Sequence, residues 1–162
     1  MRPAYVSLGS NIDPERNLLL GLAALARIGL VRRVSPVYES EAAGPPGQPR
    51  FLNAVVQVEV QEDDETLRSH LRRLESDLGR LRTDDKYAPR PIDLDLIARE
   101  GFIDPGVRVH AYLAVPLADI APDLRLGSDG ETASKAADRL RHGSDIRPRP
   151  DVLLDRPKAE PE

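Results

Sequence analysis

The sequence contains no cysteine and no tryptophan, and it has only two phenylalanines and four tyrosines among its 162 residues. The lack of cysteine excludes disulfide bonds and thiolate metal sites. No apolar run approaches the roughly 20 residues that are needed to span a membrane. Arg2 and Pro3 are followed by a short strand-like run, so no secretory signal peptide is visible. We therefore expect a cytoplasmic protein without a membrane partner.

A net positive charge is also lacking. Lysine and arginine contribute 23 charges against 27 from aspartate and glutamate, which gives a formal net charge of −4. An acidic surface does not attract nucleic acid as a whole, so we expect no nucleic-acid partner. Basic residues nevertheless gather in the middle of the chain, at Arg80, Arg82, Lys86 and Arg90. This cluster is typical of a site for a small anionic ligand, and the simpler alternative is a solvated helix end followed by a charged loop.

The length suits one domain with a sizeable core. We expect this domain to cover residues 1–143. Four prolines occur in the last fifteen residues, and this composition favours an extended or partly disordered tail over residues 144–162.

Hydrophobic periodicity predicts an alternation of strands and helices. Apolar, valine-rich runs predict strands at residues 4–8, 31–38, 52–60 and 92–98, and shorter ones at 102–109 and 113–115. Leucines at helical spacing predict helices at residues 14–27 and 64–78, followed by shorter helices at 116–121 and 132–140. Asp13 and either Asp63 or Asp64 are the expected N-caps. The order βαββαβ is typical of an α+β, ferredoxin-like fold with helices on one face of the sheet and additional short elements.

The segment Ile92–Leu96, with the sequence IDLDL, carries the strongest chemical signal. Alternate side chains of a strand share a face, so Asp93 and Asp95 are expected side by side, opposite their apolar neighbours. Two carboxylates this close repel each other, and a divalent cation relieves that repulsion. Magnesium usually takes one or two carboxylates and bridges substrate phosphates. The alternative is an ordinary amphipathic strand with a solvated polar side.

The upstream arginines favour the metal interpretation. Arginine binds phosphate oxygens in bidentate fashion, and phosphoryl transfer needs a metal and cations more than covalent chemistry. The known glycine-rich phosphate loops are absent. The Pro/Gly-rich loop at residues 44–50 leads to Phe51 and Asn53, which can stack on a flat ring and bond to a heterocycle edge. Taken alone, Phe51 is expected in the core.

Four segments in this order resemble the 6-hydroxymethyl-7,8-dihydropterin pyrophosphokinase family of the folate pathway. They are Ser7–Asn11, Gly44–Asn53, Leu78–Leu96 and Val115–Pro122. The resemblance covers roughly residues 4–125. It implies a ferredoxin-like fold and transfer of pyrophosphate from ATP to the hydroxymethyl group of a reduced pterin, leaving AMP. It also implies two magnesium ions held by Asp93 and Asp95.

The resemblance assigns roles to further residues. It implies that the pterin lies near Ser40, Ala43, Phe51, Asn53, Tyr87 and Tyr112. It implies phosphate-facing, catalytic roles for Arg80, Arg82 and Arg90. It places the nucleotide near Glu75, Arg80, Arg90, Leu96 and His110.

The chain departs from the family pattern at two informative places. Tyr87 stands where the family often has a tryptophan. The family stretch that precedes the match at Val115 is shortened here to residues 108–112, and an ATP-contacting arginine is missing with it, so that Arg108 is the candidate substitute. This shortening supports an alternative function, a pterin-binding or regulatory domain with weakened catalysis. A third and weaker hypothesis keeps the aspartates as a metal site for phosphodiester chemistry on nucleic acid.

Overall fold

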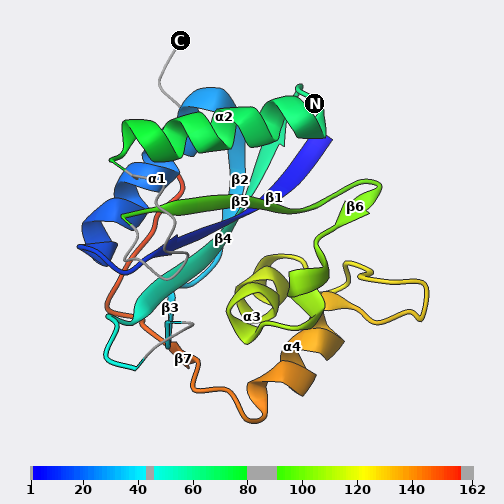
Figure 1. Cartoon of the computed structure of the whole chain (residues 1–162). Helices are drawn as coiled ribbons and strands as arrows, with labels where there is room; N and C mark the ends of the chain where they lie inside the picture. Colours follow the sequence, from blue (N-terminus) through cyan, green and yellow to red (C-terminus); the bar gives the residue numbers. More distant parts are fainter. Residues whose placement is uncertain (1, 43–45, 80–90, 158–162) are drawn as a thin grey trace.

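A computed structural model describes residues 2–42, 46–79 and 91–157. Its elements are β1 (Arg2–Ser10), α1 (Pro14–Ile28), β2 (Leu30–Val34), β3 (Tyr38–Ser40), β4 (Phe51–Val60), α2 (Asp64–Asp77), β5 (Asp93–Arg99), β6 (Phe102–Ile103), the 3-10 helix η1 (Pro105–Arg108), α3 (Ala111–Ile120), α4 (Ala133–Arg141) and β7 (Arg147–Pro148). Within these described residues, seven strands form one antiparallel sheet (Figure 1).

The strands follow the order β6-β5-β1-β4-β3-β7, and β2 pairs with β4 beside β3. β2 pairs with the half of β4 around Val58, whereas β3 pairs with the half around Leu52. The two short strands therefore act together as one interrupted edge strand of a ferredoxin-like sheet. The prediction of an α+β, ferredoxin-like fold is confirmed.

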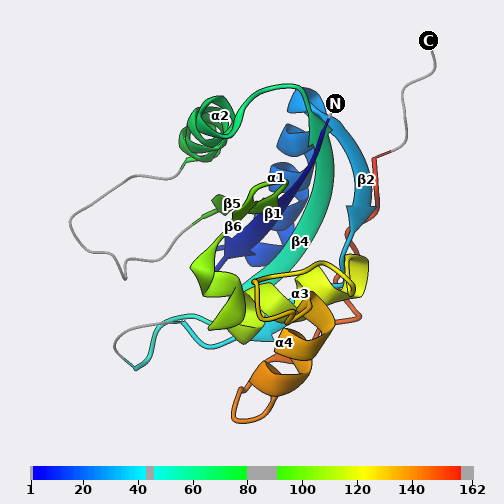
Figure 2. The same ribbon diagram turned by 90° about the vertical axis from the view of Figure 1, so that its right-hand side faces the viewer.

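One face of the sheet packs against α1 and α2 (Figure 2). The leucine spacing explains this, because Leu18, Leu22 and Leu25 of α1 and Leu67 and Leu71 of α2 are all buried in one core. The strands contribute alternate residues to the same core: Ala4, Val6, Leu8, Ala54, Val56, Val58, Ile92, Leu94 and Leu96. The central strands of the sheet thus turn every second side chain away from this layer.

The opposite face carries a second, smaller core under α3 and α4. Val55 of β4 and Ile97 of β5 belong to this core, together with buried residues of both helices. These helices are additions to the predicted arrangement, in which the helices lie on one face. The sheet extends beyond them at the end where β1, β4 and β5 carry polar and small residues, and this uncovered part is the candidate functional site.

Three of the predicted strands are wrong. The expected strand at 31–38 is interrupted, because the backbone N–H of Val55 donates to the Ser35 hydroxyl (2.8 Å) and Pro36 has no N–H to offer. Residues 113–115 belong to α3 rather than to a strand. Of the expected strand at 102–109, only β6 forms, and Asp104 then starts η1 by accepting from the Gly106 N–H at 2.7 Å.

The starts of α1 and α2 agree with the expected positions, whereas α3 begins at Ala111 rather than at Pro116. Asp63 is the N-cap of α2, where its carboxylate accepts from the Thr66 N–H at 2.8 Å. Asp13 is the N-cap residue of α1, but its backbone is left-handed with φ of 41° and its side chain makes no capping bond. The capping chemistry expected of Asp13 is therefore wrong.

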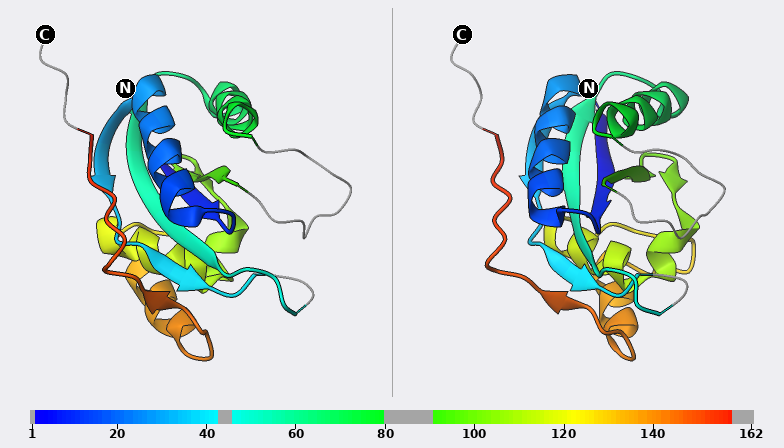
Figure 3. Two further views of the ribbon diagram at one scale, coloured as in Figure 1. Left: turned by 90° about the vertical axis from the view of Figure 1, so that its left-hand side faces the viewer. Right: turned by 60° about the vertical axis from the view of Figure 1, so that its left-hand side comes forward.

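The C-terminal segment runs back along the molecule beside α1 and β2 (Figure 3). β7 pairs with β3, and Val152 is buried with the core under α1 and α2. An ion pair joins Arg149 Nη2 to Glu15 Oε1 of α1 at 3.5 Å. The boundary at residue 143 stays a prediction. No helix in the described ranges has the length and apolar character that crossing a membrane requires.

Candidate functional site

The site is built on β1, which lies between β4 and β5. The strand register places Asn53 and Asp93 on either side of Gly9, and Val55 and Asp95 on either side of Ser7. These residues alternate with the apolar residues that face α1 and α2. Small side chains on the middle strand therefore leave a hollow between the carboxylates of β5 and the polar end of β4.

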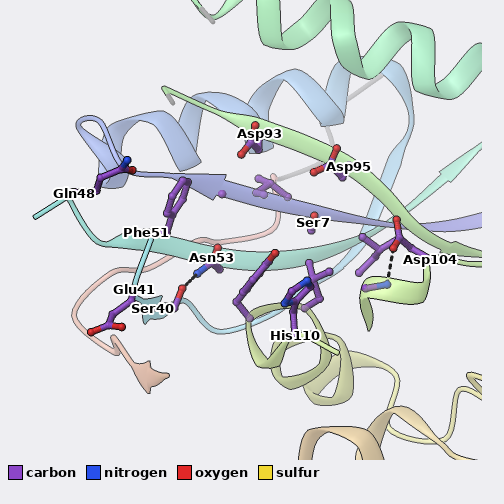
Figure 4. A pocket seen from close by; sticks show the side chains of 16 residues that line it. Ser7, Ser40, Glu41, Gln48, Phe51, Asn53, Asp93, Asp95, Asp104 and His110 are labelled. Atoms are coloured by element: carbon purple, nitrogen blue, oxygen red, sulfur yellow. Dashed lines mark hydrogen bonds between the residues drawn. The ribbon is translucent and has the colours of Figure 1, made fainter. Parts of the chain in front are cut away.

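A cavity of about 460 Å³ occupies this hollow (Figure 4). Its lining comes from four parts of the chain: Ser7, Leu8 and Gly9 of β1; Ser40, Glu41, Gln48, Phe51 and Asn53 around β3 and β4; Asp93, Asp95 and Ile97 of β5; and Asp104, Gly106, His110, Tyr112 and Leu113. A volume of this size suits a small organic ligand.

The carboxylates of Asp93 and Asp95 form one wall. Leu94 and Leu96 point to the opposite face and are 2% and 5% exposed, so the predicted alternation is confirmed. The donor set suits magnesium, which takes one or two carboxylates and completes its shell with water and phosphate oxygens. No group of three or more His, Asp or Glu side chains that could hold a metal ion occurs among the described residues.

The wall across β1 is suited to a flat ring, and we call it the ring wall: Ser40, Phe51 and Asn53. Asn53 is 6% exposed, and its Nδ2 donates to Ser40 Oγ at 2.8 Å. This bond fixes which way the amide group points. Gly9 forms the floor, since a Cβ atom there would lie 3.3 Å from Asn53 Oδ1 and 3.7 Å from Phe51 Cδ1.

The shortened segment forms the third side of the cavity. His110 and Tyr112 stack with ring centroids 5.0 Å apart and an interplanar angle of 19°. Arg108, the candidate substitute for the missing arginine, is not among the lining residues. Its guanidinium pairs with Asp129 and with Glu131 (3.2 Å), so it fastens η1 to the loop that precedes α4. The structure does not favour Arg108 as a nucleotide-binding residue.

The buried side chain of Tyr38 connects β3 to α3. Tyr38 is 6% exposed and its hydroxyl donates to Asp119 Oδ2 of α3. Burial, with the Asp119 carboxylate as the second cause, raises the pKa of Tyr38 to about 12. The hydroxyl therefore keeps its proton at neutral pH, and it holds β3, two residues before Ser40, against α3.

Comparison with known proteins agrees with this geometry. A family model described as 7,8-dihydro-6-hydroxymethylpterin-pyrophosphokinase (HPPK) matches residues 5–122. The chain belongs to this family. Two relatives named 2-amino-4-hydroxy-6-hydroxymethyldihydropteridine pyrophosphokinase are similar over most of their length. The protein from Pseudomonas aeruginosa is 39% identical over 134 residues, which are 75% of this chain and 82% of the relative. The protein from Methylorubrum extorquens is 38% identical over 153 residues, which are 86% and 94% of the two chains.

Membership of the HPPK family makes the chain an enzyme, an ATP-dependent diphosphotransferase. Its cavity brings together seven of the residues singled out from the sequence: Ser40, Phe51, Asn53, Asp93, Asp95, His110 and Tyr112. Ala43, Arg80, Arg82, Tyr87 and Arg90 lie outside the described residues. Their roles, like those of the seven, stay predictions.

Two expected nucleotide-side residues do not reach the cavity. Leu96 is buried in the core under α1 and α2. Glu75 is 2% exposed on α2, on the same side of the sheet. Neither side chain is among the lining residues.

Sequence reasoning missed several lining residues, of which Ser7, Glu41, Gln48 and Asp104 have polar side chains. Asp104 had a usable signal in the series Asp104-Pro105-Gly106, which is typical of a capped turn. Ser7 and Gly9 also had one, since small residues at alternate positions of a central strand indicate that something approaches the sheet closely.

Proposed function

We propose that the chain transfers the pyrophosphoryl group of ATP to the hydroxymethyl group of 6-hydroxymethyl-7,8-dihydropterin, with magnesium held by Asp93 and Asp95 and with AMP as the second product. One observation carries the proposal: a single cavity joins a pair of carboxylates to a ring wall across a floor of small residues. The names of the relatives support the pterin substrate.

The ring wall binds the pterin in this proposal. Phe51 stacks on the bicyclic ring, and the amide of Asn53 reads its polar edge, because an amide offers both a donor and an acceptor. The bond from Asn53 Nδ2 to Ser40 Oγ holds that amide in one orientation before the ligand arrives. Such preorganisation lowers the entropy that binding costs.

The carboxylate wall receives the phosphates. Magnesium bound by these two carboxylates would neutralise charge on the phosphates. Asp93 and Asp95 would hold that magnesium, and through it the phosphates, beside the ring wall, so the hydroxymethyl oxygen would be positioned for attack on the β-phosphorus. A new oxygen–phosphorus bond forms, and the bond from the β-phosphorus to the oxygen that links it to the α-phosphorus breaks. AMP leaves with that electron pair, and the hydroxyl proton passes to solvent.

The test is release of AMP from ATP in the presence of hydroxymethyl-dihydropterin and magnesium. We expect Asp95→Ala to abolish AMP release while its circular dichroism and thermal midpoint stay close to those of the wild type. Asp138→Ala is the matched control, since this aspartate is exposed on α4 and does not line the cavity. Turnover by Asp95→Ala at the wild-type rate would contradict the proposal that Asp95 holds magnesium.

Calorimetry separates the proposed enzyme from the binding-domain alternative. If the wild type binds the pterin but not a magnesium complex of a non-hydrolysable ATP analogue at millimolar concentration, the pyrophosphokinase proposal fails. Binding of both ligands, together with AMP release, supports it.

A further inference from the structure

An ion cluster lies behind the ring wall, and Glu39 is its centre. The Glu39 carboxylate accepts from Arg147 Nε at 2.6 Å and from Arg149 Nη1 at 3.2 Å. Arg50 Nε approaches the same carboxylate at 3.3 Å. The hydrogen bond from Arg147 lowers the pKa of Glu39. The carboxylate is therefore charged at neutral pH, and it pairs with three guanidinium groups.

The cluster and the ring wall use the same two strands from opposite sides. Ser40 and Phe51 are register partners across β3 and β4, and both line the cavity. Their chain neighbours Glu39 and Arg50 turn the other way, because side chains alternate along an extended segment. The ion pair between Glu39 and Arg50 therefore ties together the backs of the two strands that carry the wall.

The third part of the cluster comes from residues 144–151, which we call the C-terminal strap. Asp145 joins it to both strands: its Oδ2 pairs with Arg50 Nη1 at 2.7 Å, and its Oδ1 accepts from the Glu41 N–H at 3.4 Å. β7 adds to the free edge of β3, with Glu39 opposite Arg147. The backbone N–H of Arg149 donates to the backbone carbonyl of Val37 at 2.8 Å. Bonds thus hold β3 along its whole length.

The strap also borders the site directly. A second cavity of about 440 Å³ adjoins the first and shares Ser40, Glu41, His110 and Tyr112 with it. Ser144 and Asp145 of the strap line this second cavity. The strap is therefore part of the surroundings of Ser40.

We infer that Glu39 is a positioning residue for the pterin half of the site, because it clamps the C-terminal strap and Arg50 to β3 and so fixes Ser40 and Phe51. The inference rests on the proposed function. Without the Glu39 charge, Arg147 loses its ion pair, whereas Arg50 and Arg149 keep their pairs to Asp145 (2.7 Å) and to Asp151 (2.9 Å). β7 is then held less firmly to β3, and the hydroxyl of Ser40 holds Asn53 less firmly in place. The carboxylate wall on β5 is on the far side of β1 and keeps its geometry.

The experiment is steady-state kinetics of Glu39→Gln with each substrate varied in turn. We expect the KM for the pterin, and the Kd for the pterin alone by calorimetry, to rise about tenfold, equivalent to about 1.4 kcal/mol. The KM for ATP and kcat should stay close to the wild type. Glu59→Gln is the matched control: it is the same substitution in the same sheet, it breaks an ion pair to Arg32 at 3.2 Å, and Glu59 does not line the cavity. It should leave both KM values unchanged.

The outcomes separate the inference from the proposed function. Absence of AMP release by the wild type overturns the proposed function, whatever Glu39→Gln does to pterin binding. An active wild type whose pterin KM and Kd are unchanged by Glu39→Gln overturns the inference alone. An equal rise of both KM values also overturns it, since that indicates a general loss of structure. If Glu39→Gln does not fold, Arg147→Gln removes only one of the three arginines and is measured in the same way.

Discussion

Substitution of Gly9 by alanine tests how closely the cavity is built around its ligand. The added Cβ would lie 3.3 Å from Asn53 Oδ1, 3.7 Å from Phe51 Cδ1 and 4.0 Å from Asp93 Cβ. Asn53 has little room to retreat, because it is buried and bonded to Ser40 at 2.8 Å. A shift that costs one hydrogen bond to the ligand is worth about 1 kcal/mol, or about fivefold in pterin affinity. Overpacking adds further cost, in the range of about 1–3 kcal/mol.

The assay is the AMP-release reaction, with the pterin and ATP varied separately. We expect Gly9→Ala to raise the KM for the pterin by at least that fivefold factor and to change the KM for ATP much less. Gly21→Ala is the control, since its Cβ would meet Ile92 Cδ1 at 3.1 Å on the other face of the sheet. It should leave both KM values unchanged. A Gly9→Ala enzyme whose pterin KM equals that of the wild type would refute the placement of the ring at this wall.

Two further predictions concern stability. Arg99 has a side chain with 0% exposure, and its guanidinium bonds to Asp64 Oδ1 and to the Val60 carbonyl, both at 3.1 Å. Asp64→Ala should lower the free energy of unfolding, measured with urea, by about 3–5 kcal/mol, because it leaves the buried Arg99 charge uncompensated, whereas Arg99→Met should lower it less. Glu65→Gln in the same helical turn controls for the effect of charge on the helix dipole. Equal losses for Asp64→Ala and Arg99→Met would contradict the reasoning. The pKa values of Glu39 and Asp63 are lowered in the folded protein by hydrogen bonds, from Arg147 and from Thr66 respectively. Their contribution to stability is therefore present above their ordinary pKa values of 4.5 and 3.8 and is lost as the pH falls through the lower folded values. As the pH is lowered through this range, the thermal midpoint should fall less in a Glu39→Gln, Asp63→Asn double variant than in the wild type. The same dependence of the midpoint on pH in both proteins would contradict a contribution from these two groups.

Local patterns were sufficient for helices α1 and α2 and for the carboxylate wall. Leu67 and Leu71 are separated by one helical turn and are both buried, as their spacing predicted. Asp93 and Asp95 share a face because a strand repeats every two residues, and this holds whatever the rest of the fold does. These features depend on a few neighbouring residues, so a single sequence carries them.

Features that depend on distant contacts were not predictable. The run Leu113–Val115 is apolar and short, and such a run fits a buried helix as well as a strand. Its helical state follows from packing between the sheet and α4. In the same way, Asp104 reaches the cavity because β6 and η1 return the chain toward β1, and the ties of Glu39 to Arg147 and Arg149 span more than a hundred residues.

The interruption between β2 and β3 has a consequence for association with other chains. A long, flat edge strand is a template for aggregation, since its outer N–H and C=O groups can pair with any extended segment. Here the edge is divided into pieces of five and three residues. Pro36 stands at the break, Arg32 and Arg33 are exposed on the first piece, and β7 covers the second. The same segment that supports the ring wall thus also covers one of the two pieces of this edge.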